Sequence, residues 1–155
     1  MATLNVTITE ELTLNGADRG SVNTLSVASV TQVYHRIVTC PASSDTTIAT
    51  FQTATSTSDN AIDLEDAKYV RVTNLDGSNP VNLSLQVSAD EDGAADSSAT
   101  ILLAAGRSYI MGATHDGIAV SDANANIVTA LTDLESILID PGSNAVSMEV
   151  FIASY

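Results

Sequence analysis

Hydrophobic and polar residues alternate with a period of two along much of the chain, which is typical of β-strands that bury one face. Residues 81–87 are the most regular example, with valine or leucine at every odd position and asparagine, serine or glutamine between them. Residues 4–8 and 146–152 repeat the pattern. Runs rich in β-branched or aromatic residues predict further strands at residues 22–30, 32–40, 47–53, 68–74, 100–111, 118–120 and 136–140.

Glycine, proline, asparagine and aspartate gather at residues 15–20, 76–80 and 140–144, where they predict chain reversals. We expect each loop to join consecutive strands into an antiparallel pair. Residues 57–66 and 124–134 could form at most a turn or two of helix, because neither has a long apolar stripe. The pattern predicts an all-β, jelly-roll-like antiparallel β-sandwich of about 8–10 strands with little helix. Residues 1–155 form a single domain in this interpretation.

The charge balance limits the possible partners. The chain has 5 Lys and Arg against 19 Asp and Glu, a formal net charge of −14. Such a chain repels phosphate, so we expect neither nucleic acid nor an anionic membrane as a partner. The first basic residue is Arg19 and the longest apolar run is residues 101–105. We therefore expect no signal peptide or transmembrane helix and synthesis in the cytoplasm.

No residue combination predicts catalysis. The single cysteine, Cys40, precedes Pro41 without a nearby cationic cluster, and we interpret it as a small buried hydrophobic residue. His35 lies in phase with its apolar neighbours in a predicted strand, and His115 lies in a turn beside Asp116; neither has a third metal ligand at a typical spacing. Nucleophile-elbow and phosphate-loop motifs are absent. We therefore expect no enzyme, no cofactor and no metal.

Two acidic segments keep a binding module open as an alternative. Residues 90–96 contain four acids, and oxygen-rich loops of this kind can bind Ca²⁺. Residues 122–133 resemble an EF-hand loop, but Ile127 occupies the position that requires glycine and Asp133 the position where glutamate is usual. A glycan site usually needs aromatic platforms, and the chain has no Trp. We interpret both segments as solvated loops, and keep a calcium- or glycan-binding β-sandwich module as the second alternative.

Residues 68–111 resemble a module of small virion proteins from tailed bacteriophages. In that module a strand ending in Arg-Val-x-Asn, here Arg71 to Asn74, precedes a strand of alternating apolar residues. A Leu-x-x-Gly-x-Ser-Tyr turn, here Leu103 to Tyr109, then leads into another strand. The resemblance implies a capsid decoration (cement) protein that binds and stabilises the major capsid lattice. The first alternative is a tail or head-fibre component.

The resemblance also implies where the chain acts and what it binds. The expected location is the virion, and the expected partners are the major capsid protein or other virion proteins. Homo-oligomers, with a trimer favoured, are the expected assembly. Contacts are expected on the two terminal strands, because exposed strands add readily to a neighbour's sheet and aromatic residues dominate interfaces. The expected interface residues are Leu4, Val6, Ile8, Val150, Phe151 and Tyr155.

Overall fold

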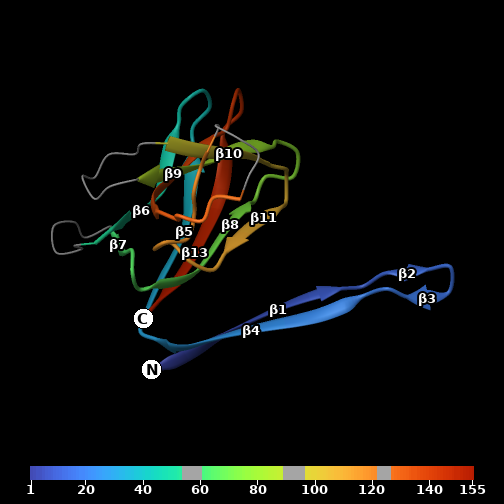
Figure 1. Cartoon of the computed structure of the whole chain (residues 1–155). Helices are drawn as coiled ribbons and strands as arrows, with labels where there is room; N and C mark the ends of the chain where they lie inside the picture. Colours follow the sequence, from blue (N-terminus) through green and yellow to red (C-terminus); the bar gives the residue numbers. More distant parts are fainter. Residues whose placement is uncertain (54–60, 89–96, 122–126) are drawn as a thin grey trace.

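Two β-sheets packed face to face form the body of the molecule, and a two-stranded ribbon extends away from it (Figure 1). The computed structural model describes residues 1–53, 61–88, 97–121 and 127–155. Every regular element within these ranges is a strand, which confirms the predicted all-β sandwich class. Across the same ranges there is no helix of the length and apolar character that a bilayer crossing requires.

The body contains a four-stranded and a five-stranded sheet. The four-stranded sheet has the order β11-β8-β13-β5 and is antiparallel throughout. The five-stranded sheet has the order β10-β9-β12-β6-β7, and only its short β6-β7 pair is parallel. The strands of the first sheet are β5 (Gln32–Cys40), β8 (Ala67–Asn74), β11 (Ser108–Met111) and β13 (Val146–Ser154). Those of the second are β6 (Thr46–Gln52), β7 (Ile62–Asp63), β9 (Val81–Ser88), β10 (Ser97–Leu103) and β12 (Asp133–Asp140).

The alternating residues of both sheets meet between the layers. Along β13 every second side chain from the first residue to Ile152 is fully or almost fully buried, and the intervening ones are only half-buried. The period-two pattern therefore assigns the inner face of this strand correctly. The largest fully buried side chains are Phe51, Val70, Val72, Val81, Leu83, Val87, Leu134, Ile137, Ile139, Met148, Val150 and Ile152.

Residues 2–30 lie outside the sandwich, although the sequence analysis places them within it. They form a long hairpin of β1 (Ala2–Glu10) and β4 (Ser21–Val30), which among the described strands pair only with each other. A small tip of β2 (Thr13–Leu14) and β3 (Ala17–Asp18) closes it. We call residues 2–30 the arm. At about 3.3 Å per residue, its strands are roughly 30 Å long.

Two of the three predicted hairpins are wrong. Asn15 and Gly16 have positive φ angles of 52° and 76° and form the turn at the arm tip, as predicted. Residues 76–80, however, lead from β8 to β9, and residues 140–144 from β12 to β13, so each loop crosses from one sheet to the other. The turn residues mark a reversal correctly. They do not specify whether the chain returns in the same sheet or crosses the ~10 Å to the opposite one.

Asn74 stabilises the loop at residues 76–80, which leads from one sheet to the other. Its side-chain amide donates to the carbonyl oxygen of Asn79 (2.8 Å), its side-chain oxygen accepts the N–H of Asp76 (3.0 Å), and its backbone N–H donates to the carbonyl oxygen of Arg107 (2.9 Å). Asn74 is fully buried. The Arg-Val-x-Asn pattern therefore ends in a residue that holds the loop after β8 against the turn before β11.

Other predicted boundaries also shift. The run at residues 100–111 is two strands, because the chain turns through Gly106, whose φ is +68°. Residues 118–120 contribute only an isolated bridge from Ile118 to Thr132. Of the two weak helix predictions, residues 61–66 contain a short strand and a turn, and residues 127–134 contain no helix. The remainder of both segments lies outside the described residues.

Candidate protein-interaction surface: the arm and the adjoining sheet face

The arm has one apolar and one polar face, which follow from its register. Leu4 lies opposite Val27 and Val6 opposite Leu25, so these four side chains share one face, which Ile8 continues. The other face carries mainly Asn, Ser and Thr side chains. Thr7 and Thr24 contact each other there through their hydroxyl oxygens at 3.3 Å. The arm is therefore an amphipathic ribbon.

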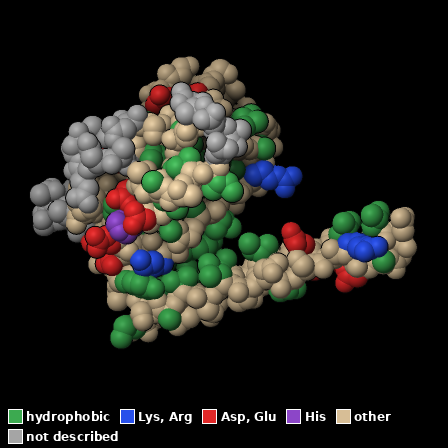
Figure 2. Space-filling view, viewed as in Figure 1, with side chains coloured by type: hydrophobic (Ala, Val, Ile, Leu, Met, Phe, Trp, Pro, Cys, Tyr) green, Lys and Arg blue, Asp and Glu red, His purple; other side chains and the backbone are tan. Residues whose placement is uncertain are grey.

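The root of the arm packs its apolar face on the body. Val27 and Val30 of the arm are buried with Tyr69 of β8 and Ala153 of β13. Leu4, Val6 and Phe151 pack against this group at its margin. We call these seven residues the root cluster. Figure 2 shows a band of hydrophobic side chains where the arm meets the body. The contact fixes the arm at one end only.

Beyond the root cluster, the apolar residues of the arm face solvent. Ile8 and Leu25 are 47% and 46% exposed, although they continue the face that is buried at the root. Val22 on the opposite face is exposed as well, and so are Leu12 and Leu14 near the tip. Ile8 and Leu25 are diagonal neighbours on one face, and adjacent exposed apolar residues are typical of interaction sites. The distal arm therefore has the character of an uncovered protein-binding surface.

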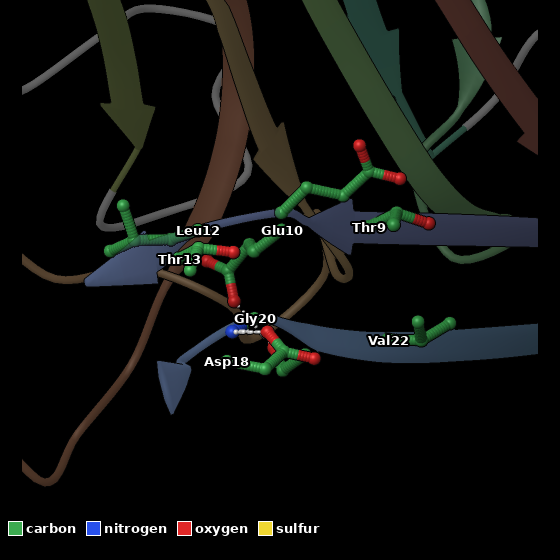
Figure 3. Close-up of a pocket in the computed structure, with 9 residues that line it drawn as sticks. Thr9, Glu10, Leu12, Thr13, Asp18, Gly20 and Val22 are labelled. Atoms are coloured by element: carbon green, nitrogen blue, oxygen red, sulfur yellow. Dashed lines mark hydrogen bonds between the residues drawn. The ribbon is translucent and has the colours of Figure 1, made fainter. Parts of the chain in front are cut away.

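A hollow lies between shaft and tip, where the end of β1 faces the start of β4 (Figure 3). Asp18 accepts a hydrogen bond from the backbone N–H of Gly20 at 2.8 Å, and Glu10 accepts one from the hydroxyl of Ser21. Gly20 is required there, because a Cβ at this position would lie 2.1 Å from the carbonyl oxygen of Glu10. The hollow is lined by Thr9, Glu10, Glu11, Leu12, Thr13, Asp18, Gly20, Ser21 and Val22.

The outer face of the four-stranded sheet adjoins the arm root. Glu149 on β13 accepts a hydrogen bond from Arg71 at 2.7 Å and contacts Nε2 of His35 at 2.9 Å. Arg71 also lies over the ring of Phe151, and the His35 ring lies 5.6 Å from the same ring. The hydrogen bond from Arg71 lowers the pKa of Glu149 below its usual value, and His35 adds to this effect. This face therefore carries an ionised carboxylate between two basic groups.

His115 joins two carboxylates near the start of β12. Its Nδ1 lies 3.0 Å from Asp133, and its Nε2 lies 3.4 Å from Asp116. Asp133 also accepts the backbone N–H of Asp116 at 2.7 Å, so these contacts close the loop before β12. Imidazole and carboxylate are ligands for divalent cations, and these groups are close enough to share one. The sequence predicts Asp116 as a partner of His115, because the two residues are adjacent, but it does not predict Asp133.

The predicted interface residues separate into two groups. The prediction of Val150 as an interface residue is wrong, because its side chain is fully buried between the sheets and β13 is paired on both sides. Phe151, one position later, faces outward in the root cluster, where Leu4 and Val6 also lie. Ile8 is exposed on the arm, and Tyr155 is 47% exposed beside Lys68, whose Nζ lies 5.0 Å from the ring centroid. Contact of Leu4, Val6, Ile8, Phe151 and Tyr155 with a partner stays a prediction.

The remaining site predictions concern the thiol and the acidic loops. Cys40 is a fully buried free thiol whose pKa burial raises, which confirms its interpretation as a small core residue. The acidic segment at residues 90–96 lies outside the described residues. The EF-hand-like segment is described only from Ile127 to Asp133, where Asp133 serves the loop contacts of His115.

Fold and surface together define a class: an all-β sandwich protein with a projecting N-terminal hairpin arm. No protein-family model matches the chain, and no curated protein matches it. A solved structure from Bacillus endospore appendages, described as a family of disulfide-linked pili, is similar at a TM-score of 0.38. The sequences are 15% identical, and the match covers 84% of this chain and 96% of that one. This degree of likeness supports no conclusion about the function of the chain.

Proposed function

We propose that the protein is a non-enzymatic structural subunit of a virion, most concretely a capsid decoration protein that binds and stabilises the major capsid lattice. The observation that carries an assembly role is the arm, which holds apolar side chains in solvent away from the body. The virion as the location rests on the resemblance of residues 68–111 to phage virion modules. Tail or head-fibre attachment is the alternative location for the same subunit.

The body has the properties that an assembly subunit needs. Its hydrophobic core lies between the two sheets. The longer edge strand is β5 in the four-stranded sheet and β10 in the five-stranded sheet. The arm adds a binding element that is packed on the body at its root and exposed along its distal half. Docking of an apolar ribbon removes apolar surface from water, which is the main driving force of protein association.

Co-sedimentation with shells of the major capsid protein tests the proposal. We would incubate the purified chain with expanded shells of a tailed-phage major capsid protein. Stoichiometric binding at the shell surface, seen by electron microscopy, is the expected result. Ile8→Glu should weaken that binding, whereas Thr7→Glu, on the polar face of the same strand, should leave it unchanged.

If the chain fails to bind shells and is found on tails, the result would support the alternative that it is a tail component. Failure to associate with any virion component would refute the proposal.

A further inference from the structure

We infer that the distal arm of one copy docks on the outer face of the four-stranded sheet of a second copy, beside β5. The inference rests on the proposed assembly function and names the partner of the arm: another molecule of the same chain. The exposed apolar side chains on both surfaces carry it, because they continue a contact that the chain already makes at the arm root.

The receiving surface is the free margin of the four-stranded sheet. Val33 and Ile37 on β5 are 54% and 66% exposed, although both lie on the outer face that the root cluster partly covers. The register places them on either side of His35, which lies opposite Phe151 of the root cluster. Since β5 is the last strand of its sheet, its outer edge is also open to another strand.

The intrachain contact at the root shows the chemistry that the intermolecular contact would repeat. There, one stretch of the apolar arm face is buried on Tyr69, Ala153 and Phe151. The next residues on that arm face are Ile8 and Leu25. On the β5 side of the outer sheet face the exposed apolar residues are Val33 and Ile37, and Ile110 on β11 lies at the opposite margin. Both surfaces are therefore continuations of a contact that the chain already makes.

The charge on this sheet face does not oppose a second copy as the occupant. On the outer face of the four-stranded sheet, the charged strand residues are Arg71 and Glu149, which pair with each other at 2.7 Å. Arg36 lies opposite the buried Val150 and so belongs to the side of β5 that faces the other sheet. The only acid in the strands of the four-stranded sheet is Glu149. The distal arm carries three acids and one arginine: Glu10, Glu11, Asp18 and Arg19. In a chain with a net charge of −14, this face carries no net negative charge that would repel the acidic arm of a second copy.

The arm cannot reach this acceptor on its own molecule, because its distal half points away from its own body (Figure 1). Each copy therefore offers an arm to one neighbour and a sheet face to another. Contacts of this head-to-tail kind close into a ring where the rotation permits it, and otherwise extend into a chain.

Sedimentation velocity of the purified full-length chain, without any virion protein, tests the inference. We expect concentration-dependent self-association of the wild type. Ile8→Glu damages the arm and Ile37→Glu damages the sheet face, and each should weaken self-association at least about tenfold. Leu102→Glu is the matched control, because Leu102 is 69% exposed on β10 of the opposite sheet. It should behave like the wild type.

A mixture of the two damaged variants identifies the geometry. The intact arm of the Ile37→Glu chain should bind the intact sheet face of the Ile8→Glu chain, giving a 1:1 complex that neither variant forms alone. A wild type that stays monomeric at high concentration would overturn the inference, and so would a mixture that fails to associate. Shell binding is measured separately, so a monomer that still binds shells refutes this inference alone. A self-associating chain that ignores every virion component refutes only the proposed function.

Discussion

Replacement of Val27 by alanine should loosen the arm without weakening the body. Val27 is 8% exposed and is one of the two arm residues buried in the root cluster. The arm pairs with none of the sandwich strands that the structure describes, so its docking depends mainly on these side-chain contacts. One backbone hydrogen bond at the junction, from Thr31 N–H to the carbonyl oxygen of Ser154 (3.0 Å), adds to them. We expect the arm to open as a unit of its own, before the sandwich unfolds.

The magnitude follows from the groups removed. Valine to alanine deletes two methyl groups, and at about 0.8 kcal/mol for each buried group the root should lose roughly 1.5 kcal/mol of docking free energy. That loss changes the docking equilibrium about tenfold. Because Val27 belongs to the root cluster and not to the core between the two sheets, the packing of that core should be unchanged.

Native-state hydrogen exchange measures both units in one experiment. Amides of β4 near Val27 should exchange about tenfold faster in Val27→Ala, while amides of β13 keep their wild-type rates. The urea midpoint of the body should not move. Val22→Ala is the matched control, since it makes the same deletion on the same strand at a position that is 66% exposed. Equal acceleration in β4 and β13, with a lower urea midpoint, would show that arm and body unfold together and would refute the reasoning.

Three further predictions concern the body and the tip. Because the pKa of Glu149 is lowered by Arg71, the contribution of this carboxylate to stability is complete above the unfolded-state pKa and is lost as pH falls through the folded-state pKa. Glu149→Gln should therefore be less stable than the wild type at neutral pH, and the difference in urea unfolding should shrink in acid. Asn74→Ala leaves buried backbone groups without partners and should cost about 1–3 kcal/mol in the same assay. Gly20→Ala should disturb the arm tip and speed its cleavage by protease, whereas Gly112→Ala, with nothing within 4 Å of the added Cβ, should not.

The alternation along the strands predicts the inner face of the sandwich well, because burial between two sheets imposes a period of two directly. Met148, Val150 and Ile152 all lie in the core, as their spacing indicates. The same spacing excludes Val150 from an outer surface and allows Phe151 there. The error in the interface prediction was thus one of parity, since neighbouring residues of one strand point to opposite sides.

Contacts between distant segments could not be predicted. His115 and Asp133 contact each other because β12 begins beside the loop that contains His115. The two residues are far apart in the sequence, so no local pattern predicts this contact. Loops that cross between sheets use the same turn residues as hairpins, so residues 76–80 and 140–144 gave no sign of their different role. The arm is the largest case: its strands and its turn are evident in the sequence, but its separation from the body is not.

The arm also shows why an alternating pattern does not imply a buried face. Leu4, Val6 and Ile8 are equivalent in sequence, yet Leu4 and Val6 pack at the root while Ile8 lies in solvent. An isolated two-stranded ribbon is marginally stable in water, and exposed apolar residues gain nothing while it stays undocked. The pattern becomes favourable along its whole length only when a second surface covers the distal half. A hairpin of about 30 Å, with its root alone covered, is therefore best explained as one side of an interface.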